Sequence, residues 1–191
     1  MSIEVRTADA GRWTDLEALF GPSGAYSGCW CMWFRVSGRE FGRNGNAGNR
    51  AALEALVRGG EPVGLLAYAE GVPAGWAAVA PRSAYHRILR SPALRPTDPD
   101  EARVWSVPCF FVGRPHRRAG VAAALLDAAV GHARAEGATV LEGYPVDTGA
   151  GRVPPAAELY TGTVEQFARA GFFQHARPAT GRRVVMRRRV T

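Results

Sequence analysis

Apolar residues recur every three or four positions over residues 121–136, the strongest helix pattern in the chain. An apolar run typical of a buried strand lies on each side of it, 104–112 before and 139–144 after. Pro108 interrupts the first run, and a proline inside a strand marks a bulge or an unpaired edge. A helix between two strands is the crossover that a parallel pair requires. We therefore expect a parallel strand–helix–strand unit at the centre of the fold.

Further strands and helices are predicted around this unit. A chain of 191 residues has the size of one domain, so we expect a single domain over residues 1–191. Hairpins combined with a parallel crossover give a mixed sheet, so the predicted fold class is α/β with an α+β mixed sheet. The other expected strands are 3–8, 63–69, 72–80, 172–177 and 183–190, and the other helices are 12–20, 47–58 and 163–170.

Two segments have unusual composition. Residues 83–102 contain three prolines and are expected to form an irregular connection that holds a functional loop or a short helix. Residues 28–36 are densely aromatic, and both faces of an alternating pattern there are apolar. The alternation predicts a strand covered on both sides, with Trp30, Met32 and Phe34 on one face and Cys29, Cys31 and Trp33 on the other.

The net charge of +7 comes from 24 arginines and no lysine. These residues are spread along the chain, apart from Arg187–Arg189, and no basic helix with interleaved aromatics is present, so we do not expect nucleic-acid binding. No run of about 18 apolar residues appears, so no membrane span is expected. Residues 1–13 lack the apolar region of a secretory signal. The expected compartment is the cytoplasm.

The three cysteines are Cys29, Cys31 and Cys109. An odd number without an export signal favours reduced thiols. The Cys29–Cys31 spacing is too close for a zinc site without further ligands, although Cys109 could approach the pair in space. We expect no metal, with the thiols acting as small apolar groups.

The loop before the strongest helix has the features of an anion site. Arg117 and Arg118 precede Gly120 and Ala122, which open the helix. A helix start presents unpaired N–H groups and a positive dipole end, and small residues let an anion approach them. Neither the Gly-Lys-Ser/Thr of a P-loop nor the G-x-G-x-x-G of a dinucleotide fold is present. The prediction is a pyrophosphate site, and the alternative is an ordinary helix entry with surface arginines.

The pattern Arg117-x-x-Gly120-x-Ala122 resembles the Q/R-x-x-G-x-G/A signature of the GNAT acetyltransferases. The strand before it (109–112), the stop at Gly137 and the late FARAGF at 167–172 resemble the family as well, as does the order of elements over nearly the whole chain. The resemblance implies a GNAT-like acyl-CoA N-acyltransferase fold with a splayed central sheet, and acetyl-CoA as the cosubstrate.

The same resemblance implies a binding mode. The pantetheine arm would pair with strand 104–112 near Phe111 and Val112, and one of their N–H groups would polarise the acetyl carbonyl. The break at Pro108 would correspond to the family's bulged strand. The CoA pyrophosphate would lie beside Arg117, on the backbone of Arg118, Ala119, Gly120, Val121 and Ala122.

The proton-transfer residues are less conventional. Many members of the family use a tyrosine of the last helix as the general acid, and this chain has Phe167 at that position. Tyr160, just before that helix, is the expected substitute, with Ser106 and Cys109 as further candidates. Glu142 is the expected base, because a charged residue inside an apolar strand is rarely buried without purpose. The alternative for Glu142 is a solvated residue at a strand end.

Aromatic residues are expected to bind the acceptor. The predicted substrate-binding residues are Trp30, Trp33, Trp76 and Tyr144, which would suit an apolar, aromatic or cationic acceptor. The alternative is that the aromatics of segment 28–36 pack in the hydrophobic core.

The predicted function is acetyl-CoA-dependent N-acetylation of a small-molecule primary amine by direct transfer. One alternative is a catalytically silent acyl-CoA-binding module, which the phenylalanine at position 167 favours. Another is acetylation of a peptide or protein amine, or of a charged tRNA. Dimerisation is common in the family, so a homodimer is a further expectation.

Overall fold

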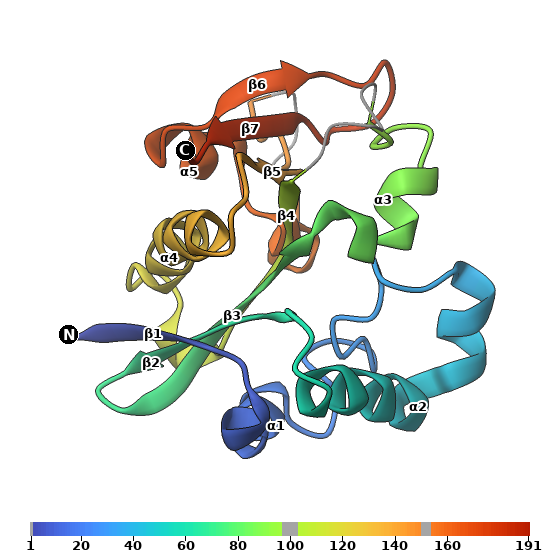
Figure 1. The fold of residues 1–191 in the computed structure, drawn as a ribbon, viewed down its shortest axis with the longest axis vertical. Coiled ribbons are helices and arrows are strands. Elements are labelled where there is room, and N and C mark those ends of the chain that lie inside the picture. The colour runs from blue at the N-terminus through green and yellow to red at the C-terminus, as the bar shows by residue number, and fades with distance from the viewer. Residues whose placement is uncertain (1, 97–102, 150–153) are drawn as a thin grey trace.

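The computed structural model describes residues 2–96, 103–149 and 154–191, and its framework is one seven-stranded mixed sheet (Figure 1). The strand order is β1-β2-β3-β4-β5-β7-β6. The strands are β1 (Ile3–Thr7), β2 (Gly64–Ala69), β3 (Val72–Pro81), β4 (Val104–Val112), β5 (Val140–Gly143), β6 (Phe173–Ala176) and β7 (Val185–Arg189).

Among the residues that the structure describes, five α-helices connect the strands, with short 3-10 turns between them. They are α1 (Trp13–Phe20), α2 (Gly38–Arg58), α3 (His86–Arg90), α4 (Val121–Ala135) and α5 (Val164–Arg169). Every predicted helix is present, and the predicted mixed α/β fold class is confirmed.

The strand pairing confirms the central unit. β4 and β5 pair in parallel, with Val104 opposite Val140 and Val107 opposite Gly143, and α4 forms the crossover between them. Every other neighbouring pair in the sheet is antiparallel. Figure 1 shows β6, β7 and α5 at one end of the molecule and β1 and α1 at the other.

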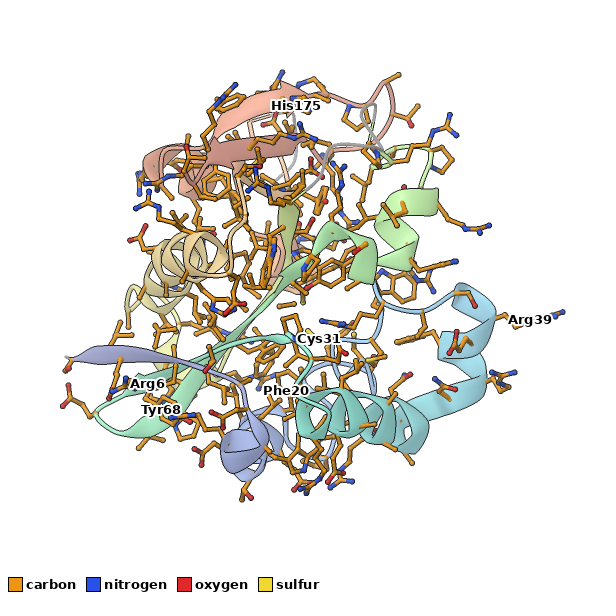
Figure 2. The ribbon with its side chains drawn as sticks, viewed as in Figure 1. Arg6, Phe20, Cys31, Arg39, Tyr68 and His175 are labelled. Carbon is orange, nitrogen blue, oxygen red and sulfur yellow. The ribbon has the colours of Figure 1, made fainter. Side chains whose placement is uncertain are left out.

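The sheet has an apolar core on each face. Successive residues of a strand point to opposite faces, and β2 follows this rule, because Leu65 packs with α4 whereas Leu66 packs with α1 and α2. Leu125 of α4 is completely buried, and such burial stabilises the fold by about 2 kcal/mol per leucine. Figure 2 shows Phe20 of α1 in the interior beneath the sheet.

β4 carries the predicted bulge. Cys109 lies opposite Ala78 of β3 and Ser106 lies opposite Ala80, so two residues of β4, Val107 and Pro108, stand against one of β3. The pairing with β5 covers only Val104–Val107, so beyond Pro108 the two strands are no longer paired. The second half of β4 thus has an open edge on the side away from β3.

The prediction of a strand over 28–36 is wrong. This segment consists of turns, because Trp30 and Cys31 have φ of 44° and 55°, left-handed values that no extended strand contains. Turn hydrogen bonds such as Met32 N–H to Cys29 O, at 2.8 Å, hold this shape. The six aromatic and sulfur side chains therefore do not separate onto two strand faces.

Two further elements differ from their predicted extent. α2 begins nine residues before the predicted start at 47, at Gly38, with the Ser37 hydroxyl accepting from Glu40 N–H as a cap, and it kinks at Gly45. The expected irregular connection at 83–102 contains α3, a short helix as anticipated, while its residues 97–102 lie outside the described part.

In the part of the chain that the structure describes, no helix has the length and apolar character needed to cross a membrane. The cytoplasmic compartment and the single-domain organisation stay predictions.

Candidate active site

A cleft of 620 Å³ lies along the open edge of β4 and is called the β4 cleft below. Its walls come from the end of β4, the loop before α4 with the first turn of that helix, the segment before α5, and the loop after α1. They are lined by Ala25, Tyr26, Phe110, Phe111, Val112, Arg114, His116, Arg117, Arg118, Gly120, Val121, Ala122, Ala123, Leu159, Tyr160, Gly162, Thr163 and Gln166.

The peptide groups that face this cleft follow from the pairing of β4. Gly113 N–H donates to Ala74 O of the β3 side at 3.0 Å. Because peptide groups alternate in direction along a strand, those of Val112 and Phe110 point away from β3, toward the cleft. Arg117 Nε donates to Val112 O at 3.2 Å on that side. The peptide of Phe111 instead faces β3, and Phe111 contributes its side chain to the cleft wall.

The other end of the cleft is the start of α4. Gly120 is the N-cap residue with φ 82°, and no side chain caps the helix. The first helical hydrogen bond runs from Ala124 N–H to Gly120 O, so the N–H groups of Val121, Ala122 and Ala123 precede the ladder. The site predicted for a pyrophosphate therefore lies in the same cleft as the open strand edge.

A second cavity of 290 Å³ adjoins the β4 cleft and is called the apolar cavity below. The two share Ala25, Tyr26, Phe110, Phe111 and Tyr160 in their walls. The rest of its lining is Ser27, Cys29, Cys31, Trp33, Phe34, Phe41 and Cys109. None of these described residues carries a formal charge at neutral pH, apart from any ionised thiol.

All three cysteines of the chain line the apolar cavity. Trp76 Nε1 donates to Cys31 Sγ at 2.9 Å. The Cys109 thiol that faces Cys31, together with this indole, lowers the pKa of Cys31 despite its burial, and the same contact raises the pKa of Cys109 well above the usual thiol value. Burial raises the pKa of Cys29 to about 11. Cys31 is therefore the thiol that ionises first, while the other two stay protonated at neutral pH.

Tyr160 lies where the β4 cleft meets the apolar cavity, since it lines both. The Arg183 guanidinium donates a hydrogen bond to its hydroxyl oxygen. Phe167, at the position where the family resemblance implies a tyrosine, is completely buried and packs against Phe110 and Phe172. A residue at position 167 therefore lies in the core on the α4 side of the sheet, whereas Tyr160, just before α5, lines the cleft.

Glu142 lies in a buried polar network and lines none of the cavities described above. Its carboxylate accepts from Arg187 Nε at 2.7 Å and from Tyr144 OH at 2.6 Å, and Arg82 Nη1 lies at 3.4 Å. Tyr144 OH is also 2.9 Å from Ser106 Oγ. The expected alternative of a solvated strand end is wrong, because only 1% of Glu142 is exposed.

Tyr144 does not reach the acceptor side either. It is completely buried, and burial together with the Glu142 carboxylate holds the pKa of its phenol well above the usual value. Its proton is therefore retained and donated to Glu142. The contacts of both residues are those of a structural network, while their predicted catalytic and substrate-binding roles stay predictions.

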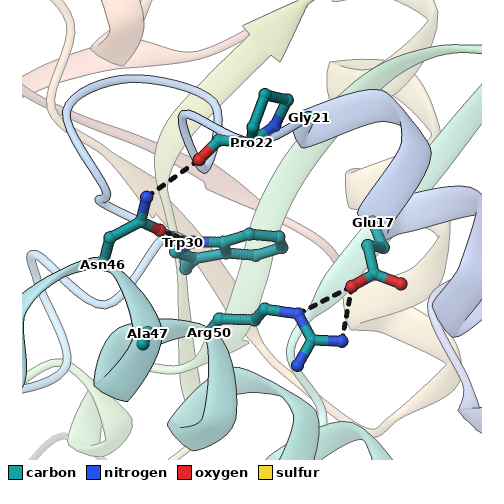
Figure 3. A pocket seen from close by; sticks show the side chains of 7 residues that line it. All are labelled: Glu17, Gly21, Pro22, Trp30, Asn46, Ala47 and Arg50. Carbon is teal, nitrogen blue, oxygen red and sulfur yellow. Dashed lines mark hydrogen bonds and ion pairs between the residues drawn. The ribbon is translucent and has the colours of Figure 1, made fainter.

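The three tryptophans predicted to bind substrate lie in different places. Trp33 lines the apolar cavity, whereas Trp76 is completely buried behind Cys31. Trp30 lines a separate hollow of 540 Å³ between α1 and α2 (Figure 3). There Trp30 Nε1 donates to Asn46 Oδ1 at 2.5 Å, beside the Arg50–Glu17 ion pair. The structure thus brings only Trp33 of these three to the apolar cavity.

The structure adds residues that the sequence did not identify. Tyr26 lines both cavities, and Gln166 joins the two sides of the β4 cleft by donating to Ala122 O at 3.2 Å. Arg183 reaches Tyr160 from the loop before β7. No pattern marks these positions, because a tyrosine in a glycine-rich loop and one arginine among 24 look like surface residues in a sequence.

Comparisons with known proteins agree with this geometry. The model of the acetyltransferase (GNAT) family matches residues 30–160. No curated protein sequence matches the chain. Among solved structures, PaiA N-acetyltransferase of Thermoplasma acidophilum in complex with coenzyme A is similar at a TM-score of 0.57 and 12% identity, covering 99% of each chain.

Two more structures share the fold. The putative acetyltransferase YncA of Salmonella typhimurium, with its cofactor acetyl-CoA, aligns at a TM-score of 0.56 and 16% identity, over 100% of this chain and 95% of its own. AAC(6')-Ib in complex with ribostamycin and coenzyme A aligns at a TM-score of 0.59 and 17% identity, over 99% of this chain and 94% of its own. At these identities the likeness shows the fold.

Glu142→Gln is expected to destabilise the protein by about 3 kcal/mol, because it removes the negative charge that two buried guanidiniums contact. Urea denaturation measures the free energy of unfolding. The matched control is Glu165→Gln, which breaks the exposed pair with Arg169 and should cost under about 1 kcal/mol. Equal small losses in both variants would contradict the structural role of Glu142.

Proposed function

The chain belongs to the GNAT family of acetyltransferases, and we propose that it transfers the acetyl group of acetyl-CoA directly to a small-molecule primary amine. The observation that carries the proposal is the continuity of the β4 cleft. One end offers the N–H groups at the start of α4, and the other offers the open strand edge beside the apolar cavity.

The cosubstrate would lie along this cleft. The N–H groups of Val121 and Ala122, with Arg117 and Arg118 at the rim, suit the pyrophosphate, because a helix start attracts anions. The pantetheine amides would pair with the peptide groups of Val112 and Phe110. An N–H group at that edge would then stabilise the oxyanion as the amine attacks the acetyl carbon. No metal is needed for this step.

Tyr160 would act as the general acid. The amine nitrogen forms a bond to the carbonyl carbon, the carbon–sulfur bond breaks, and the CoA sulfur leaves as a thiolate that takes the phenol proton. The proton that the newly bonded nitrogen loses would pass through water to the Tyr160 phenolate, which restores the phenol and balances the step. Arg183 is the donor in its hydrogen bond to the phenol oxygen, so the proton of the Tyr160 phenol remains available for transfer. The same guanidinium would stabilise the phenolate that forms.

The apolar cavity favours the reactive form of the acceptor. An ammonium group loses hydration energy when it enters a cavity without a carboxylate, so the neutral amine is the form that enters. None of the described residues lining this cavity is an acid or a histidine. Glu142 is buried within β5 and pairs with two arginines, so in this proposal it stabilises the structure and does not remove the proton from the amine.

A catalytically silent module is the second candidate. Phe167 supports it, because the resemblance implies a tyrosine there and this side chain is locked in the core. Such a module would bind acetyl-CoA and release no CoA in the presence of any amine.

The proposal predicts CoA release from acetyl-CoA when the protein is given a panel of small primary amines, and a kcat about 10²-fold lower in Tyr160→Phe, because the general acid is lost. Thiol release measured with a chromogenic disulfide checks both. The affinity for acetyl-CoA, measured by calorimetry, should be unchanged in Tyr160→Phe.

Tyr26→Phe is the matched control, because it removes a hydroxyl from the same two cavities without touching the predicted acid. Equal rate losses in the two variants would exclude a specific role for Tyr160. Binding of acetyl-CoA without release by any amine would favour the silent module.

Gly120→Val is expected to weaken acetyl-CoA binding at least about tenfold, because a branched side chain strains the left-handed backbone at φ 82° and projects into the open space beside the helix start. Calorimetry measures the affinity. Gly131→Ala, in the exposed middle of the same helix, should leave the affinity intact and raise stability by about 0.5–1 kcal/mol. An unchanged affinity in Gly120→Val would remove the loop from the cosubstrate site.

A further inference from the structure

We propose that the acceptor amine carries an anionic group, a carboxylate or a phosphate, which binds in a cleft on the far side of Trp33 and Phe34 from the apolar cavity. This inference rests on the proposed function and specifies its substrate class. The cleft has a volume of 420 Å³ and is called the basic cleft below. It shares Trp33 and Phe34 with the apolar cavity, so the two adjoin, and in this proposal one small molecule extends past these side chains from one to the other.

The basic cleft carries an excess of positive charge. Arg87 and Arg90 of α3 and Arg183 of the loop before β7 line it, and none of its described lining residues is acidic. None of these three guanidiniums forms an ion pair with a carboxylate of the described residues. Elsewhere arginines of this protein do pair, as Arg50 does with Glu17. Three like charges around one cleft repel one another, and a bound anion relieves that repulsion.

Arg87 is held in place for such a ligand. Its guanidinium stacks on the ring of Trp33 at 3.7 Å from the centroid. Gly38 allows its close approach, because a Cβ there would stand 3.2 Å from Arg87 Nη2. Arg87 Nε is buried and has no hydrogen-bond partner among the described residues, and the same is true of Nδ1 of the neighbouring His86. The stacking on Trp33 thus orients the guanidinium before any anion arrives. A buried donor without a partner is costly, so an anion that accepts a hydrogen bond from this arginine would remove that cost.

Arg183 links the basic cleft to the reaction site. Its guanidinium lies 5.7 Å from the ring centroid of Phe34 and donates to the hydroxyl of Tyr160. Tyr160 in turn lines the β4 cleft, where the thioester would lie. An anion held by the arginines, followed by an apolar spacer along Phe34, would therefore place an amine near Tyr160.

Carboxylate and phosphate share the feature that arginine recognises, because both present two oxygens to the fork of a guanidinium. The probes are ω-amino acids and ω-aminoalkyl phosphates with three to six carbons between the two groups, and the matching neutral ω-amino amides. At equal length, the anionic amines should show a KM at least about tenfold below that of the neutral amides, because each lost charged hydrogen bond costs about this factor. Comparison of the carboxylate series with the phosphate series then identifies which anionic group the basic cleft prefers.

Arg90→Gln is the first variant, because Arg90 is exposed and its loss should not disturb folding. It should raise the KM for the preferred anionic amine about tenfold and lower the ratio of kcat/KM for the anionic amine over the neutral amide. Arg87→Gln should have the larger effect. The matched control, Arg43→Gln, removes an exposed charge of α2 outside the basic cleft and should keep the ratio.

Calorimetry of the same amines in the presence of CoA measures binding without turnover. Anionic amines that bind no more tightly than the amides overturn the inference, and so does a ratio that stays constant in both cleft variants. Acetylation of neutral amines alone overturns it while the proposed function stands. In a third outcome the anionic amine binds, Arg90→Gln weakens this binding, and no acetyl transfer occurs. That outcome supports the anion site and overturns the proposed function instead.

Discussion

The site depends on one local constraint, the extra residue in β4 at Pro108. Proline has no N–H to donate to a neighbouring strand, and the extra residue turns the strand away from its former partner. Before this point β4 pairs with β5 on one side and β3 on the other, and after it only β3 remains. The open edge, the cleft beside it and the apolar cavity all lie beyond that residue.

The buried polar network fixes the place where the two strands separate. Ser106 and Glu142 are opposite each other in the last paired stretch of β4 and β5, and Tyr144 OH contacts both. Arg187 of β7 joins the network from the next strand of the sheet. A carboxylate that sequence reasoning assigned to catalysis therefore holds β4, β5 and β7 together at the base of the gap. Replacing such a group with an apolar side chain would require several partners to change at once.

The sequence predicted those parts of the molecule that follow a repeating pattern. The helix at 121–136 and its flanking strands were predictable because burial of one face imposes a period, and Pro108 marked the bulge because its chemistry is local. The turns of segment 28–36 were not predictable from the sequence. The left-handed backbone at Trp30 and Cys31 depends on contacts with α2 and the sheet rather than on an alternating pattern. The buried network around Glu142 was not predictable for a similar reason: its two arginine partners lie 60 and 45 residues away in the chain. Tyr160 was identified by elimination, and only the fold shows that it lies at the junction of two cavities.

An open strand edge is normally a hazard, because its unpaired peptide groups can recruit strands from other molecules and begin aggregation. In this protein the edge of β4 is short and Pro108 offers no donor there. Arg117 already holds Val112 O, and the edge lies at the bottom of a cleft that Tyr160 and Gln166 help to enclose. The pantetheine arm of the proposed function is a slender chain that needs little room, whereas a pairing strand would also have to accommodate side chains on both of its faces. In the proposed function, the same enclosure that leaves this edge open to a thin ligand would also protect the protein from edge-to-edge association.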